Sequence, residues 1–223
     1  PPTWRGKNRR HPLPDPNNFA PQGVEGKWRR LGGQLTGSVR DGVVPAGLKP
    51  AWENQSPALA EVVRDINKYS NNVMTQQVLL TLGKERMGVG SLEAGRAALA
   101  QWWQLRWPAA EMPQVENGAG LSRHARISAQ ALGRMLQTAW GSSVMPEFVA
   151  SMPISGMDGT LRRSKASASA HLKTGSLRDT NALAGYVHGN SGQRYVLVAL
   201  INHPNAGAAR PVMDALVDWV AQD

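Results

Sequence analysis

Apolar residues recur at three- and four-residue spacing from Ser56 onward, and this pattern predicts amphipathic helices. The first predicted helix follows Ser56-Pro57, a serine N-cap with a proline in the first turn, and covers residues 59–69. A second helical pattern, residues 73–83, begins after the polar corner Ser70-Asn71-Asn72. Because Ser and Asn side chains compete with helical hydrogen bonds, we expect this corner to break the helix and to face a cleft.

Two further helical patterns, residues 92–106 and 129–140, begin after Ser91 and Ser128, which are placed as N-caps. Residues 154–161 predict a tight loop in which Asp158 forms a turn. Residues 162–169 are small and polar, and we expect them to be mobile. A last helical pattern, residues 206–221, closes the chain.

The stretch between residues 170 and 202 changes to the pattern of β-strands. Two apolar, β-rich runs, residues 182–188 and 195–201, flank the polar link Gly189-Asn190-Ser191-Gly192, which is typical of a hairpin. Lys173-Thr174-Gly175 then lies on the first of three antiparallel strands. Helices followed by a hairpin-rich sheet and a returning helix predict the α+β class, with an antiparallel sheet flanked by helices.

Residues 1–33 lack this periodicity, are rich in proline and carry clustered charges. We predict that they form an irregular basic arm, and that residues 34–223 form the folded domain. The alternation of residues 34–39 predicts a short strand at the start of that domain.

The composition excludes several kinds of chemistry. The chain of 223 residues has no cysteine, which excludes disulfides, thiolate catalysis and cysteine-ligated metal sites. Its histidines, among them His171, His188 and His203, form no helical i,i+4 pair, so we expect no metal site. No apolar run approaches the roughly 20 residues of a membrane span, and no signal peptide is visible at the start of the chain.

The net charge is +9, and the first 30 residues carry seven basic residues against two acidic ones. A basic surface attracts anionic partners such as nucleic acid, membranes or cell-wall polymers. No aromatic-interleaved RNA-binding motif accompanies these charges, so we expect a solvated basic tail and no nucleic-acid partner.

Two polar motifs carry the candidate chemistry. Ser70-Asn71-Asn72 alone is equally compatible with an ordinary inter-helix cap, and Lys173-Thr174-Gly175 alone with protection of a strand edge. Together, Ser-x-Asn and Lys-Thr-Gly form the pairing found in β-lactamases and penicillin-binding proteins, where a Ser-x-x-Lys motif accompanies them.

The sequence around both motifs resembles a known family. Four segments carry the resemblance, in matching order and spacing: residues 66–80 (INKYSNNVMTQQVLL), 116–123 (ENGAGLSR), 152–161 (MPISGMDGTL) and 171–187 (HLKTGSLRDTNALAGYV). They are similar to the C-terminal portion of the peptidase S13 family of D-alanyl-D-alanine carboxypeptidase/endopeptidases, the PBP4-like or DacB-like penicillin-binding proteins.

This resemblance covers about residues 34–223, whereas the first 25 residues resemble nothing in the family. It implies a β-lactamase/transpeptidase-like fold that is incomplete, because the N-terminal part of that domain is absent. The segment Glu116-Asn117-Gly118-Ala119-Gly120 differs from the family's usual Asp-Gly-Ser-Gly version.

The resemblance implies catalytic roles for three residues. Ser70 is expected near the leaving-group nitrogen, where it helps to relay a proton, and Asn72 is expected to bind the substrate backbone. Lys173 is expected to supply positive charge and to orient Ser70. No lysine of the chain has a serine three residues before it, so the Ser-x-x-Lys nucleophile motif is absent.

The resemblance also implies substrate-binding roles for the three residues that follow Lys173. Thr174 is expected to bind the terminal carboxylate, and Gly175 to let the substrate backbone lie against the strand. The backbone N–H of Ser176 is expected to form half of the oxyanion hole.

The implied function is a serine-type D-Ala-D-Ala carboxypeptidase/endopeptidase that acts on peptidoglycan stem peptides, binds β-lactams and needs no cofactor. The implied location is periplasmic. We expect this chain alone to be an inactive fragment, whose sheet is completed by a missing N-terminal portion or by a second chain. The alternative is a non-catalytic binding module for anionic cell-wall polymer or nucleic acid.

Overall fold

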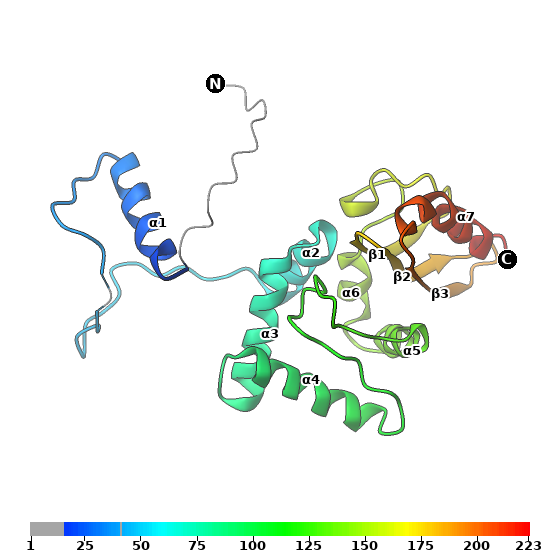
Figure 1. The fold of residues 1–223 in the computed structure, drawn as a ribbon, viewed down its shortest axis with the longest axis horizontal. Coiled ribbons are helices and arrows are strands. Elements are labelled where there is room, and N and C mark those ends of the chain that lie inside the picture. Colours follow the sequence, from blue (N-terminus) through cyan, green and yellow to red (C-terminus); the bar gives the residue numbers. More distant parts are fainter. Residues whose placement is uncertain (1–15, 41) are drawn as a thin grey trace. The chain divides into compact units, whose positions relative to one another are not determined.

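The computed structural model describes residues 16–40 and 42–223. The chain forms two compact units, one ending at Gln55 and the other comprising Ser56–Asp223. The described part of the first unit contains helix α1 (Pro16–Arg30), and all other labelled elements in Figure 1 belong to the second unit.

Helix α1 corrects the prediction that residues 1–33 are irregular, for the part of that arm that the structure describes. The helix contains Pro21 but no proline after it, and Arg29 forms an i,i+4 ion pair with Glu25 at 2.9 Å. Basic residues in the last turn also suit the negative end of the helix dipole. A high proline content therefore did not exclude a helix in this arm.

The short strand predicted for residues 34–39 is absent from the described residues, which is a second correction. The carbonyl oxygen of Gln34 accepts a hydrogen bond from the indole of Trp28, and that of Leu35 accepts one from Arg29. Backbone groups expected to join a sheet bind side chains of α1 instead.

The helical part of the second unit follows the sequence pattern closely. Its helices are α2 (Leu59–Tyr69), α3 (Asn72–Met87), α4 (Leu92–Arg106), α5 (Ala129–Trp140) and α6 (Met145–Ser151). The N-caps predicted at Ser91 and Ser128 are confirmed, because Ser91 Oγ accepts from the N–H of Ala94 and Ser128 Oγ accepts from that of Ala131, each at 3.1 Å. The N-cap predicted at Ser56 is wrong, because the first helical hydrogen bonds of α2 end on the carbonyl of Ala58, which is the N-cap residue and makes no side-chain cap hydrogen bond.

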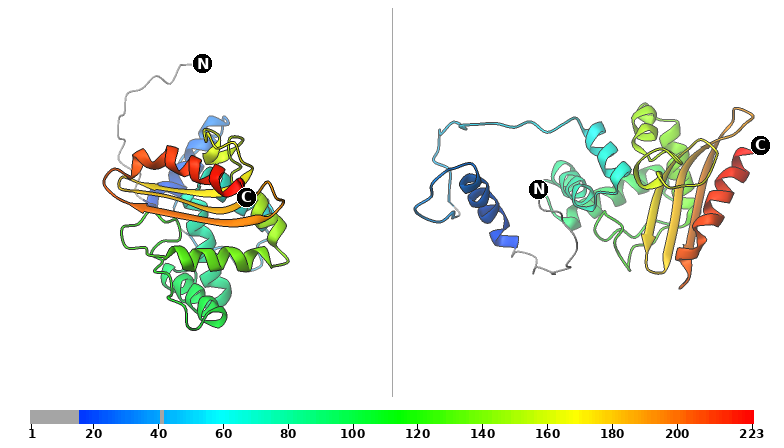
Figure 2. Two further views of the ribbon diagram at one scale, coloured as in Figure 1. Left: turned by 90° about the vertical axis from the view of Figure 1, so that its right-hand side faces the viewer. Right: turned by 90° about the horizontal axis from the view of Figure 1, so that it is seen from above.

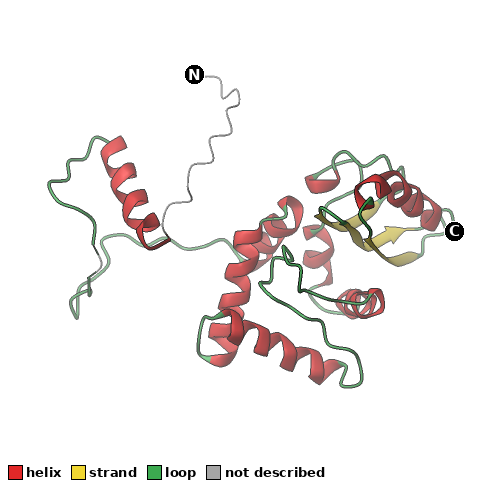
Figure 3. Ribbon diagram, in the orientation of Figure 1, coloured by secondary structure: helices red, strands yellow, loops and turns green. Residues whose placement is uncertain are grey.

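The sheet consists of β1 (Ala170–Leu177), β2 (Thr180–His188) and β3 (Arg194–Asn202), paired antiparallel in the order β1-β2-β3. The register places Lys173 opposite Ala184 and Thr174 opposite Leu183. Among the described residues, β1 is therefore an edge strand, and no other described strand pairs with the outer side of its Lys-Thr-Gly segment. Figure 3 shows the three strands grouped beside the C-terminal helix.

Helices cover both faces of the sheet, which confirms the predicted α+β class (Figure 2). Helix α7 (Arg210–Ala221) packs Met213 and Val217 against Leu172, Leu183 and Val187. On the opposite face, Tyr186 packs with Leu136 of α5 and Met152. Alternation of side chains along each strand thus divides the core between the two helical layers.

Residues 162–169, expected to be mobile, are hydrogen-bonded to α7. Asp214 accepts from the hydroxyl of Ser164 at 2.6 Å and from the N–H of Lys165 at 3.1 Å. Asp218, one turn further along the helix, accepts from the N–H groups of Ser167 and Ala168. Small polar residues there provide donors for two carboxylates rather than flexibility.

Among the helices of residues 16–40 and 42–223, none has the length and apolarity needed to cross a bilayer.

Candidate active site

Ser70 ends helix α2 in a left-handed backbone conformation, with φ 54° and ψ 50°. It is the one non-glycine residue with positive φ in the described part of the chain. Such a conformation costs an L-residue roughly 1–2 kcal/mol. The next residue, Asn71, caps α3 by accepting from the N–H of Met74 at 3.1 Å. In this corner Asn71 therefore caps α3, whereas Ser70 and Asn72 line a pocket.

An ion pair holds the end of α2 that carries Ser70. The ammonium of Lys68, a buried side chain, lies 2.5 Å from Oδ2 of Asp158, whose Oδ1 accepts from the N–H of Ile154 at 2.8 Å. Burial by itself would raise the pKa of Asp158, but the hydrogen bonds from Lys68 and Ile154 bring it below the usual value. Asp158 therefore ties the loop to the end of α2 through Lys68, a partner that the sequence did not identify.

Gly159 brings the same loop against the backbone of α2. Its φ is +53°, and a Cβ added there would lie 2.5 Å from the carbonyl oxygen of Lys68. Asn67 makes a second contact, because its amide donates to Ser151 Oγ of α6 at 2.8 Å. The strained corner is therefore fixed on two sides by packing that leaves it little freedom.

Lys173 reaches the corner from the sheet. Its Nζ donates to Ser70 Oγ at 3.2 Å and to the carbonyl oxygen of Thr174 at 2.9 Å. Burial lowers the pKa of Lys173, because removal from water disfavours the charged form. A lysine that loses its proton more readily and touches a serine hydroxyl can orient that serine and exchange a proton with it.

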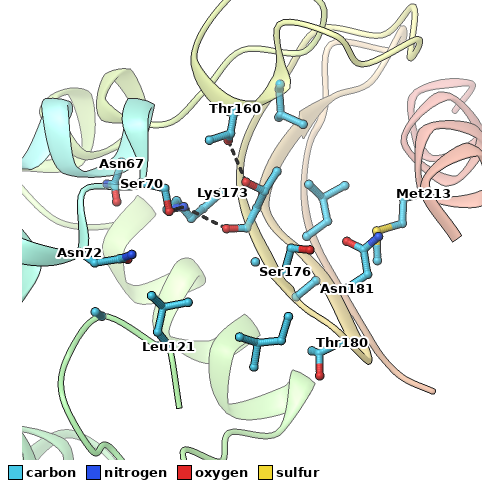
Figure 4. A pocket seen from close by; sticks show the side chains of 18 of the residues that line it. Asn67, Ser70, Asn72, Leu121, Thr160, Lys173, Ser176, Thr180, Asn181 and Met213 are labelled. Carbon is cyan, nitrogen blue, oxygen red and sulfur yellow. Dashed lines mark hydrogen bonds between the residues drawn. The ribbon is translucent and has the colours of Figure 1, made fainter. Parts of the chain in front are cut away.

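Thr174 points to the other face of β1, since successive strand side chains alternate. Its hydroxyl donates to Thr160 Oγ1 at 2.7 Å, which ties β1 to the loop that contains Asp158 (Figure 4). An added Cβ at Gly175 would meet Ala182 Cβ at 3.4 Å, an ordinary contact. Packing within the described chain therefore does not require glycine at this position.

All six predicted site residues line one pocket of about 970 Å³. They are Ser70, Asn72, Lys173, Thr174, Gly175 and Ser176. Residues that the sequence did not single out also line it, including Asn67, Thr160, Arg163 and Arg210. No local signal distinguishes these four, because only the fold brings their distant segments to one cavity.

The family model described as the D-Ala-D-Ala carboxypeptidase 3 (S13) family matches residues 4–223. The expectation that the first 25 residues resemble nothing in the family is therefore wrong. A D-alanyl-D-alanine carboxypeptidase from Actinomadura sp. strain R39 is 27% identical over 201 residues, which cover 84% of this chain and 37% of the relative. Carboxypeptidase DacB from Mycolicibacterium smegmatis is 30% identical over 189 residues, which cover 78% of this chain and 40% of the relative.

The crystal structure of penicillin binding protein 4 from Haemophilus influenzae, complexed with a β-lactam, superposes with a TM-score of 0.71. The match has 20% sequence identity and covers 92% of this chain and 52% of that one. The likeness confirms the penicillin-binding fold. The chain spans about two fifths of the length of the two curated relatives.

Proposed function

Because the chain belongs to the D-Ala-D-Ala carboxypeptidase 3 (S13) family, we propose that its pocket forms part of a serine-type acyl-transfer site. Its substrates would be peptidoglycan stem peptides that end in D-Ala-D-Ala, and β-lactams would enter the same pocket. The observation that carries the proposal is the hydrogen bond of 3.2 Å between Lys173 Nζ and Ser70 Oγ at the pocket.

The proton transfers of acyl transfer explain why this pair is needed. A serine nucleophile loses a proton when it attacks a carbonyl, and the amine that leaves must gain one. In our proposal Ser70 passes a proton toward the leaving nitrogen, and Lys173 orients the Ser70 hydroxyl. Asn72, at the start of α3, hydrogen-bonds the peptide backbone of the substrate.

The free edge of β1 supports the proposed substrate-binding roles. The substrate backbone would lie along β1, where Gly175 offers no side chain to obstruct it. Packing inside the described chain does not require glycine at position 175. This supports the proposal that a bound substrate is what requires a residue without a side chain there. Thr174 would bind a carboxylate through its hydroxyl, and the N–H of Ser176 would face the oxyanion. Such a donor typically lowers the barrier by about 3–4 kcal/mol.

Acyl-enzyme formation also requires a serine nucleophile that these 223 residues do not supply as Ser-x-x-Lys. We propose that the nucleophile belongs to polypeptide outside this sequence, and that the chain by itself is inactive. Residues 34–223 would then be the C-terminal part of the penicillin-binding domain. The remaining part would pair with β3, the edge of the sheet opposite to β1. The periplasm is the proposed location, since stem peptides occur there.

The absent nucleophile motif also favours a second candidate function. In this alternative, the chain is a non-catalytic module that binds cell-wall polymer through the same pocket or through its basic residues.

A fluorescent penicillin separates the two functions. The chain alone should remain unlabelled in a denaturing gel, whereas a protein that joins it to a Ser-x-x-Lys segment of the family should form a labelled adduct that resists boiling. Labelling of the chain alone would overturn the claim that its nucleophile lies elsewhere. A joined protein that is folded and yet unlabelled would refute the carboxypeptidase function and leave the binding module.

A further inference from the structure

The contact between Lys173 and Ser70 joins the edge strand β1 to the corner between α2 and α3. The lysine side chain is a flexible four-carbon stem, which does not fix such a distance by itself. The distance therefore depends on how β1 and the end of α2 are held relative to each other. The short 3₁₀ turn η1 (Gly159–Leu161) packs against both of these elements.

On one side, the loop that contains η1 is bound to β1. The hydroxyl of Thr174 donates to Thr160 Oγ1 at 2.7 Å (Figure 4). Two backbone hydrogen bonds, between residues 153–155 and residues 170–172, attach the preceding part of the same loop to the start of the strand. The loop is thus fixed to β1 both before and within η1.

On its other side, the same loop is bound to α2. The ammonium of Lys68 lies 2.5 Å from Asp158 Oδ2, and a Cβ added to Gly159 would meet the carbonyl oxygen of Lys68 at 2.5 Å. Lys68 lies two residues before Ser70, and Asp158 lies two residues before Thr160. The ion pair and the Ser70 corner are therefore held by the same short segments of chain.

Together these interactions form a closed ring of contacts, which we call the contact ring. In order, it passes through Ser70, Lys68, Asp158, Thr160, Thr174 and Lys173. Three side-chain hydrogen bonds close it, and the chain segments between them span at most two residues. A misplacement of about 1 Å can slow a reaction by about 10²-fold, so a constraint on the Lys173–Ser70 distance has a catalytic consequence.

Thr160 is the member of the contact ring whose hydroxyl the fold needs least. Its side chain is exposed, and a valine there would keep its branched shape while losing the hydroxyl. Asp158, by contrast, pairs with the buried Lys68 and accepts from the N–H of Ile154 at 2.8 Å. Thr160 therefore allows the contact ring to be opened without removing the ion pair that holds the loop.

We propose that Thr160 is a positioning residue for the acyl-transfer site. Through its hydrogen bond to Thr174, and anchored by the Lys68–Asp158 pair, it sets the distance between Lys173 and Ser70. The catalytic consequence rests on the proposed function, whereas the positioning itself concerns the chain alone. Thr160 acts through Lys173 and Ser70 and has no part in the proton transfers.

The pKa of Lys173 in the 223-residue chain tests the positioning without any acylation step. NMR of the ¹³C-lysine-labelled chain follows the Cε resonance of Lys173 with pH, and Lys173→Ala identifies it. Burial lowers this pKa in the wild type. Thr160→Val should raise it toward the ordinary value, because an opened contact ring admits water to the ammonium.

Two variants serve as controls for the titration. Thr160→Ser keeps the hydroxyl and should keep the wild-type pKa of Lys173. Thr138→Val makes the same chemical change at an exposed threonine of α5 that does not line the pocket, and should also have no effect. None of these substitutions alters the charged pocket residues Arg163, Arg210 and Asp214. An unchanged pKa of Lys173 in Thr160→Val would overturn the positioning role.

The protein that joins this chain to a Ser-x-x-Lys segment tests the catalytic consequence. Stopped-flow measurement with a fluorescent penicillin gives the maximum acylation rate and the dissociation constant separately. Thr160→Val should lower the maximum rate at least about fivefold and leave the dissociation constant within about twofold of the wild-type value. Thr160→Ser and Thr138→Val should retain both wild-type values.

A double-mutant cycle with Ser70→Ala distinguishes positioning from a merely structural role. If Thr160 acts through the Lys173–Ser70 contact, Thr160→Val should cause no further loss of rate once the Ser70 hydroxyl is removed. An equal loss in both backgrounds would show that Thr160 acts elsewhere, and would contradict the proposal. An unlabelled joined wild type would refute the proposed function instead, while the pKa of Lys173 in the chain alone still decides the positioning role.

Discussion

The ammonium group of Lys173 lies 3.2 Å from the hydroxyl oxygen of Ser70, although the two residues are 103 positions apart in the sequence. Lys173 belongs to the edge strand β1, and Ser70 to the strained corner between α2 and α3. The helical and sheet parts of the second unit therefore meet at these two side chains, in a pocket with a free strand edge.

The strain at Ser70 predicts that removal of its Cβ raises the stability of the chain. Ser70→Gly removes the Cβ from a residue with φ 54°, and we expect the free energy of unfolding to rise by up to about 1 kcal/mol. Ser70→Ala keeps the Cβ and should leave stability unchanged within about 0.5 kcal/mol. Urea unfolding measures both changes. A Ser70→Gly protein less stable than Ser70→Ala would show that this corner is not strained.

The Lys68–Asp158 pair predicts an asymmetric response to removal of either partner. The side chain of Lys68 is 11% exposed and that of Asp158 is 41% exposed. Asp158→Asn leaves a buried ammonium without a counter-charge and should cost about 2–3 kcal/mol of stability. Lys68→Met leaves a carboxylate that water can reach, and should cost about 1 kcal/mol.

The double variant Lys68→Met, Asp158→Asn should be more stable than Asp158→Asn alone, because no buried charge remains unpaired. Thermal or urea unfolding of the four proteins gives the cycle. If the two single changes cost the same and simply add, the pair does not hold the end of α2.

The stacked histidines predict a loss of stability in mild acid. His171 and His188 lie 5.5 Å apart between ring centres, and burial lowers the pKa of both. At pH values below the usual pKa of 6.5, the unfolded chain therefore binds protons that the folded chain does not. The free energy of unfolding decreases as the pH is lowered, until the pH falls below the pKa of the folded state. His171→Asn should flatten this dependence. A wild-type urea midpoint that stays constant from about pH 7 to about pH 5 would contradict the shift.

The two glycines of the loop 156–159 separate backbone strain from steric contact. Both have positive φ, but an added Cβ at Gly156 comes no closer than 3.7 Å to Ser164 O, whereas one at Gly159 reaches 2.5 Å from Lys68 O. Gly156→Ala should cost about 1–2 kcal/mol, the cost of the left-handed conformation. Gly159→Ala should cost at least about 1 kcal/mol more, because the backbone must also move. Equal costs would show that the loop does not press against α2.

Short sequence patterns predicted the helix caps and the antiparallel strands, because these depend on residues that are close together in the sequence. Ser91 and Ser128 were identifiable as caps because a hydroxyl beside a helical pattern has one obvious partner. The antiparallel strands followed from apolar runs separated by a Gly-rich turn. Helix α1 escaped prediction, because proline near a helix start obscures the pattern of the residues that follow.

The site could be predicted only where a motif marks it. Ser-x-Asn and Lys-Thr-Gly located its two sides, but neither motif gives the distance between them. Lys68 and Asp158 meet across 90 positions, and Arg210 lines the pocket through the return of the final helix to the sheet. Such contacts depend on tertiary packing, which single-sequence periodicity does not encode.

The acylation rate of a protein that joins this chain to a Ser-x-x-Lys segment tests the central claim most directly. Stopped-flow measurement with a fluorescent penicillin would compare wild type with Ser70→Ala, Lys173→Ala and the control Lys165→Ala, in which an exposed loop lysine is removed. We predict that Ser70→Ala and Lys173→Ala each slow acylation by about 10²–10⁴-fold, as expected for loss of a proton relay, while the control and the fold remain unaffected. Wild-type acylation rates in both site variants would contradict the roles assigned to Ser70 and Lys173.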